Sequence, residues 1–187
     1  PISDGAAILI LASAEVAEKC TDKPVYVLGS SSATDYLTFP AREDMTHFLA
    51  SQIAMKKAIE IAGTSLWDAQ IVELYDQSTV MEMISLEDLG FCEHGKAWRS
   101  IYESCQDYKG YYEIDGKKLF VNMNGGLKAD GNPLGATGGA QIFEVFKQLR
   151  AEAGERQVKN DGELKYGCVL ELEGFGTKGY VYILGRD

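Results

Sequence analysis

The sequence has few basic residues for its length. Its 187 residues include 18 lysines and arginines against 28 aspartates and glutamates, a net charge of −10 with both histidines neutral. An acidic surface repels phosphate groups, and the sequence contains no local basic patch that would offset this repulsion. We therefore expect no nucleic-acid partner and no anionic-membrane partner. The composition, 45% apolar and 25% charged, is that of a globular domain that buries a core.

Long apolar runs are also missing. The longest run, residues 6–14, is well short of the roughly 20 residues that a membrane-spanning helix needs, and it lacks the basic flank of a signal peptide. We expect no membrane span, no signal peptide and a cytoplasmic location. The chain begins at Pro1 without an initiator methionine, which leads us to expect that upstream sequence is missing.

Cysteine and histidine are scarce. The four cysteines are widely separated and form no Cys-x-x-Cys pair, which argues against a zinc site and against a disulfide framework within this chain. We expect reduced thiols and no metal site. The two histidines are His47, beside the apolar stripe of a predicted helix, and His94, in a predicted loop. Solvated or hydrogen-bonded structural roles are expected for both.

The spacing of apolar residues predicts alternating strands and helices, which is typical of an α/β fold. The expected strands are residues 7–11, 25–28, 71–74, 168–172 and 180–184, with a loop at 29–32 after the second strand and a hairpin at 112–122 that turns at Asp115-Gly116. The expected helices are residues 14–20, 44–62 with Gly63 ending it, a helix from the turn at 75–78 to about residue 89, and a helix with Ile142, Val145, Phe146 and Leu149 on its buried face.

The stretch most informative about function is the glycine-rich loop at residues 124–139. Glycines allow a backbone to approach a ligand closely. The helix predicted to begin near Gly135 points unpaired amide groups and the positive end of its dipole toward this loop. Such a place stabilises an anion or a developing oxyanion. The alternative is a tight structural turn before a core helix, and glycine content alone favours it.

Several separate segments resemble thiolases, in the order in which that family has them. The matching segments are GNPLGATG at 131–138, similar to the Gly-His-Pro loop of the family, QLRAEAGERQV at 148–158, SLEDLGFC at 85–92, VNMNGGLK at 121–128 and DGAA at 4–7. The segments at 85–92 and 121–128 resemble the archaeal and sterol-carrier-type branch, which includes acetyl-CoA acetyltransferases. The resemblance implies the C-terminal half of the layered αβαβα thiolase fold, with a mixed sheet flanked by helices. It also implies that residues 1–22 end the N-terminal half, as its last strand and a short helix, and that residues 23–187 form the C-terminal domain.

The resemblance implies an activity as well. Thiolases are acyl-CoA C-acyltransferases that cleave or form a carbon–carbon bond of a 3-ketoacyl-CoA, so a coenzyme A thioester is the expected substrate and no covalently bound cofactor is expected. In this family a cysteine of the N-terminal half is the nucleophile, and none of the cysteines here lies in a similar segment. We therefore expect the N-terminal thiolase half as a partner. The family also implies a homodimer and, in this branch, a zinc-ribbon/OB-fold partner protein.

Three loops hold the residues that the resemblance assigns to catalysis. Asn132 replaces the histidine of the Gly-His-Pro loop, and its amide can bind an oxyanion but cannot act as a base near neutral pH. Tyr75 replaces the usual asparagine or histidine, and it can donate to an oxyanion or merely pack at the end of a strand. Glu173 lies near the position of the family's second cysteine, as an acid–base group or as a solvated loop residue. The expected substrate-binding residues are Gly131, Gly135 and Gly176.

These departures from the family pattern leave three functions open. The first is the thiolase reaction, with another residue in place of the missing histidine. His94 can take that place if its loop reaches the site, and Asp76 can orient the loop that carries Tyr75 or form only a local turn. The second function is a retro-aldolase that acts on a 3-hydroxyacyl-CoA through Tyr75 and forms no acyl-cysteine. The third is a non-catalytic scaffold subunit that keeps the fold.

Overall fold

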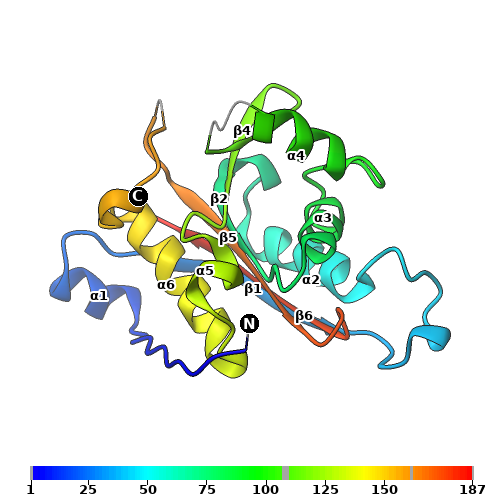
Figure 1. Ribbon diagram of the computed structural model, residues 1–187. Helices are drawn as coiled ribbons and strands as arrows, with labels where there is room; N and C mark the ends of the chain where they lie inside the picture. Colours follow the sequence, from blue (N-terminus) through cyan, green and yellow to red (C-terminus); the bar gives the residue numbers. More distant parts are fainter. Residues whose placement is uncertain (1, 107–109, 161, 187) are drawn as a thin grey trace.

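A mixed six-stranded sheet runs through the centre of the computed structural model, which describes residues 2–106, 110–160 and 162–186 (Figure 1). The strands lie in the order β1-β6-β5-β2-β4-β3. Their bounds are β1 Tyr26–Thr34, β2 Ala69–Leu74, β3 Tyr112–Ile114, β4 Lys117–Val121, β5 Tyr166–Glu173 and β6 Lys178–Gly185. Strand β2 pairs in parallel with β4 and β5, and the remaining neighbours pair antiparallel. The predicted α/β class with a mixed sheet is confirmed.

Helices cover both faces of this sheet. Their bounds are α1 Ala14–Cys20, α2 Leu49–Ala62, α3 Thr79–Asp88, α4 Ala97–Gln106, α5 Gly126–Asp130 and α6 Thr137–Leu149. Helix α2 packs on β1 and β6 with α3 beside it, and α6 packs on β5 and β2 on the opposite face (Figure 1). Val72 and Leu74 belong to the core cluster under α2 and α3, whereas Ile71 belongs to the cluster under α6. This alternation explains why the neighbouring apolar residues Ile71 and Val72 of β2 pack on opposite faces of the sheet.

Strand β1 continues through residues 29–32, so the predicted loop is wrong. These residues pair with β6 up to Thr34, and this ladder satisfies backbone groups that a loop would leave to solvent. Their small side chains suit the closeness of α2: a Cβ on Gly29 would overlap the backbone of Ala58. Glycine and serine, which are typical of loops, occur in this strand because α2 packs directly on it.

The predicted strand at residues 7–11 is also wrong for this chain. These residues have no regular secondary structure, and Ile8 and Ile10 are 86% and 93% exposed. An apolar run becomes a strand only where another strand pairs with its backbone. The N-terminal segment runs instead along the loop before α6, where the Ser3 N–H donates to the Asn132 carbonyl at 3.1 Å. Helix α1 forms as predicted, and the domain boundary between residues 22 and 23 stays a prediction.

Several element ends differ from the prediction for local reasons. Helix α2 begins at Leu49, not at Asp44, because the Asp44 carboxylate accepts hydrogen bonds from the Thr46 N–H and hydroxyl at 2.7 and 2.6 Å and holds a turn there. Its end at Gly63, with φ 63°, is confirmed. Helix α6 begins at Thr137, after a short 3₁₀ turn over Leu134–Ala136.

The predicted hairpin is confirmed. Strands β3 and β4 pair antiparallel, and the two residues between them, Asp115 and Gly116, have φ values of 50° and 75°. Positive φ at both positions is what a type I′ turn requires.

Candidate functional site

Asn132 and Tyr75, which come from different loops, are hydrogen-bonded to each other. Tyr75 follows β2 directly, and its N–H donates to the Leu170 carbonyl of β5 at 3.0 Å. The side-chain amide of Asn132 donates through Nδ2 to the Tyr75 hydroxyl at 2.8 Å. Both residues are buried, with 2% exposure for Asn132 and 5% for Tyr75. The two sequence-predicted residues thus meet at one place behind the carboxyl end of β2.

The contacts of Asn132 fix the orientation of its amide. Its Oδ1 accepts from the Leu134 N–H at 3.1 Å and from the Thr137 hydroxyl at 2.9 Å. A backbone N–H can only donate, so Oδ1 faces Leu134 and Nδ2 faces Tyr75. Leu134 reaches this position with a φ of 52°, which is uncommon for a residue with a side chain. The Tyr75 hydroxyl accepts from Asn132, so its own proton remains available to another acceptor.

A cavity of about 570 Å³ adjoins Tyr75. Its walls come from the end of β2, the beginning of α6 and the β5–β6 hairpin, and they include Tyr75, Gly135, Glu171, Glu173 and Tyr180. Gly135 therefore lies at this cavity, and its role in substrate binding stays a prediction. Gly131 and Gly176 are not among the residues that line this cavity. Gly131 borders a smaller cavity, and Gly176 packs so closely on Phe48 that a Cβ would overlap its ring.

Two glutamates of β5 face this cavity, in different environments. Glu173 forms an ion pair with Lys178 at 2.8 Å, in which the two side chains are 59% and 39% exposed. Water weakens such a pair. The Oε2 atom of Glu171 is buried and has no hydrogen-bond partner in the described part of the chain. Burial raises the pKa of Glu171 to about 8. The environment of Glu171 is therefore better suited to proton transfer than that of Glu173, and Glu171 was not singled out from the sequence.

A signal for Glu171 does exist in the sequence. Glu171 is the acidic residue in the run CVLEL. The other residues of this run are apolar, and the strand is buried on both faces. An acidic residue in such a strand is rarely accommodated without a partner or a special role. Glu173 drew attention instead because the thiolase resemblance places it near the position of the family's second cysteine.

Asp76 orients the loops around Tyr75. Its Oδ1 accepts from the Leu127 N–H at 2.8 Å, across to the first turn of α5. Gly126 permits this approach, since a Cβ there would overlap the Asp76 carboxylate. The Leu74 N–H donates to Oδ1 of Asn122 at 2.7 Å and adds a second link between the same two loops. The structure thus favours the loop-orienting role of Asp76 over a purely local turn.

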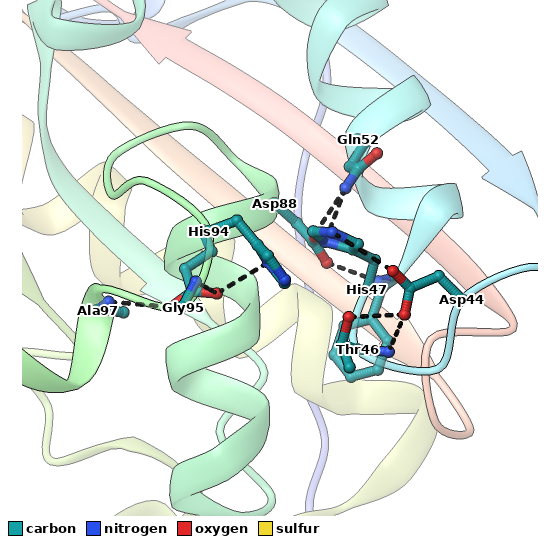
Figure 2. Close-up of polar contacts among 10 residues, drawn as sticks. Asp44, Thr46, His47, Gln52, Asp88, His94, Gly95 and Ala97 are labelled. Atoms are coloured by element: carbon teal, nitrogen blue, oxygen red, sulfur yellow. Dashed lines mark hydrogen bonds and ion pairs between the residues drawn. The ribbon is translucent and has the colours of Figure 1, made fainter.

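The two histidines lie together but do not line the large cavity. Figure 2 shows His47 beside Asp88, with Nδ1 of the histidine 2.8 Å from Oδ1 of the aspartate. The His47 and His94 rings are in contact, with their centroids 4.0 Å apart and their planes tilted by 36°, and His94 also approaches Glu87, with 3.4 Å between Nδ1 and Oε2. These contacts place both histidines in a hydrogen-bonded surface cluster, the structural role that the sequence favours. His94 is not where it could replace the missing histidine of the Gly-His-Pro loop.

The remaining sequence-level expectations concern thiols, metals and membranes. All four cysteines are free, and burial raises the pKa of Cys92 to about 11 and that of Cys168 to about 12, which disfavours their nucleophilic thiolate forms. Within the described ranges, no group of three or more His, Cys, Asp or Glu side chains is arranged to hold a metal ion. None of the helices in those ranges is both long and apolar enough to cross a membrane.

Comparisons with known proteins show the family of this chain. The thiolase C-terminal domain-like family matches residues 31–186. The acetyl-CoA acetyltransferase of Methanothermobacter thermautotrophicus is 40% identical over 186 residues, which are 100% of this chain and 46% of that protein. Sterol carrier protein 2 of Oryctolagus cuniculus is 37% identical over 163 residues, 84% of this chain and 28% of that protein.

A solved structure named Ltp2-ChsH2(DUF35) aldolase shares the fold, with a TM-score of 0.71 at 22% identity over 88% of this chain and 40% of that chain. The chain spans less than half the length of each of these relatives. It belongs to the thiolase family and corresponds to the C-terminal domain of that family.

Proposed function

We propose that this chain supplies the C-terminal side of an acyl-CoA site for carbon–carbon bond cleavage or condensation. The observation that carries the proposal is the buried Asn132–Tyr75 hydrogen bond at the wall of a cavity that also contains Glu171. The nucleophilic cysteine would come from an N-terminal thiolase half, in line with relatives more than twice as long as this chain. The substrate would be a 3-ketoacyl-CoA, with free coenzyme A as the acyl acceptor.

In this site, Tyr75 would donate its free proton to the thioester carbonyl oxygen. Negative charge grows on that oxygen when a nucleophile attacks, and a donor already in place stabilises it. Asn132 acts through Tyr75, because its amide binds the Tyr75 hydroxyl and Asn132 itself is not among the residues that line the cavity. Gly138 and Gly139, in the first turn of α6, also line the cavity and add the positive end of a 13-residue helix.

Glu171 would supply the acid–base function that Asn132 lacks. With a pKa of about 8 it carries a proton in most molecules at neutral pH and can still release it. As a carboxylate it can take a proton from the α-carbon of an acyl-CoA during condensation, and as an acid it can return one during cleavage. The geometry supports this role for Glu171 better than for the solvent-exposed Glu173.

A retro-aldolase reaction is the second candidate, and the free proton of Tyr75 favours it. Cleavage of a 3-hydroxyacyl-CoA needs a base for the 3-hydroxyl group and a donor for the thioester oxygen, but no acylated cysteine. Glu171 and Tyr75 offer these two groups within one cavity. A scaffold role without catalysis is the third candidate that the sequence raises, and a cavity lined by an unpartnered acid gives it less support.

The test uses the complete protein, with its N-terminal half. Incubation with a 3-ketoacyl-CoA and free coenzyme A should give two shorter thioesters, measured by mass spectrometry. Tyr75→Phe should lower the turnover by about 10²–10³, as for other oxyanion donors, and Glu171→Gln by about 10²–10⁴. Glu173→Gln is the matched control and should retain activity.

The same variants separate the candidates. An upstream cysteine that is labelled by an alkylating coenzyme A analogue, together with thiolysis, supports the acyltransferase. Cleavage of a 3-hydroxyacyl-CoA that survives replacement of that cysteine and is lost in Tyr75→Phe supports the aldolase. Inactivity with every substrate would leave only the scaffold role. The homodimer and the zinc-ribbon/OB-fold partner are proposals that a mass measurement of the purified complex tests.

A further inference from the structure

A second, smaller cavity of about 50 Å³ lies behind the loop that carries Asn132. Glu73 of β2 and Gln141 of α6 line it from opposite elements. Pro133, next to Asn132, also lines it, as does Thr137, whose hydroxyl donates to Asn132. The cavity therefore adjoins the groups that hold Asn132 in place, and it shares none of its lining residues with the larger cavity.

Two buried side chains of this cavity, Glu73 and Gln141, have polar atoms without a hydrogen-bond partner in the described part of the chain, although the Glu73 carboxylate also accepts a backbone hydrogen bond from Met123. Glu73 is 1% exposed and Gln141 is 3% exposed. Oε1 of Glu73, and both Oε1 and Nε2 of Gln141, make no hydrogen bond within the described residues. Buried polar atoms almost always have a partner, and a cavity shared by three that have none indicates that something polar occupies it.

The surroundings of Glu73 are negatively charged. Burial and the nearby carboxylates of Glu144, Asp76 and Asp130 raise the pKa of Glu73 well above its usual range. Arg156, the basic group that faces this cluster, already binds the buried Glu144 at 2.9 Å. Arg156 therefore does not neutralise all of these carboxylates. A bound cation would reduce the remaining repulsion among them.

We propose that this cavity binds a monovalent alkali cation, K⁺ or Na⁺, through the carboxylate of Glu73 and the amide oxygen of Gln141. Such hard cations take oxygen ligands. One carboxylate and one neutral amide oxygen provide less charge than the several carboxylates of a typical divalent site. The volume exceeds the roughly 10–15 Å³ that a single water-sized guest needs, so it has room for an ion and at least one water molecule. Such a water can accept from Nε2 of Gln141.

The ion would fix the wall behind Asn132 and thereby the Asn132–Tyr75 pair. It would compete with a proton for Glu73, so its affinity should fall as the pH is lowered. The charged groups that face Glu73 are Glu144, Asp76, Asp130 and Arg156.

Thermal unfolding of the purified protein at mildly alkaline pH tests this site without an activity assay. The unfolding temperature should be higher in KCl or NaCl than in tetramethylammonium chloride at equal ionic strength. Above the dissociation constant, each tenfold rise in ion concentration should add about 3–5 °C. Glu73→Gln should abolish the difference between the salts, whereas Glu93→Gln, which removes an exposed carboxylate, should preserve it.

A crystal of the unchanged protein soaked in a thallous salt provides a second measurement, since Tl⁺ replaces K⁺ and scatters anomalously. Anomalous density between Glu73 and Gln141 supports the site, and it decides the question if Glu73→Gln does not fold. Equal unfolding temperatures in all three salts, a salt effect that persists in Glu73→Gln, or the absence of that density would each overturn the proposal. These readouts are independent of the proposed acyl-CoA chemistry.

Discussion

At the scale of single residues, the environment of Glu171 gives a testable prediction. Its folded-state pKa of about 8 lies above the ordinary value of 4.5. The folded protein therefore binds this proton more tightly than the unfolded chain, and the contribution of Glu171 to stability is lost as the pH rises from about 4.5 to about 8. Glu171→Gln keeps a neutral side chain at every pH and should remove this loss.

We therefore expect Glu171→Gln to gain stability relative to the unchanged protein as the pH rises through this window. The gain should be on the order of 2 kcal/mol, less than the full shift implies because the side chain borders an open cavity. Urea unfolding at pH values on both sides of the window measures it. Glu173→Gln serves as the control. A stability difference that does not vary with pH would show that Glu171 is not held in its protonated form.

The sequence pointed to candidate site residues, but it did not predict how deeply each of them is buried. Tyr75 and Asn132 were identified from separate loops, and the structure joins them by one hydrogen bond. The thiolase resemblance pointed to Glu173, but only the packed strand shows that Glu171 is desolvated while Glu173 extends to solvent beside Lys178. Burial depends on what covers a strand, which a local pattern does not contain.

At the scale of elements, predictions succeeded where one face or both faces of a segment carry a clear apolar pattern. Strand β2 and helix α6 were recognised this way. The second half of β1 was not, because its glycine and serines resemble a loop, and only the approach of α2 explains them. Helix α4, over Ala97–Gln106, was not predicted. Tertiary packing outweighs local propensity in β1.

Gly29 offers a test of that packing. Gly29→Ala places a methyl group against the carbonyl of Ala58, backbone that cannot move aside without shifting α2. We expect a loss of about 1–3 kcal/mol in the free energy of unfolding, measured by urea titration. Ser32→Ala, on the exposed side of the same strand, should change stability by no more than about 0.5 kcal/mol. Equal effects of the two substitutions would contradict the close contact between α2 and β1.

At the scale of the whole molecule, the N-terminal segment is where sequence and structure differ most. Residues 7–11 have the pattern of a strand covered on both faces, yet Ile8 and Ile10 are exposed and unpaired in the described structure. Helix α1 follows them along the side of the sheet that α6 covers (Figure 1). The thiolase resemblance assigns this segment to the N-terminal half. The sheet of that half would supply the pairing strands that the apolar run lacks here.

We expect residues 7–11 to pair with the sheet of the N-terminal half in the complete protein. Amide hydrogen exchange measures this directly: these residues should exchange rapidly in the chain alone and become strongly protected in the complete protein, because a ladder of backbone hydrogen bonds slows exchange. Strand β2, buried in both cases, should stay protected throughout and serves as the internal control. Rapid exchange at residues 7–11 in the complete protein would show that the apolar run has another role, and it would remove the physical reason for assigning residues 1–22 to the N-terminal half.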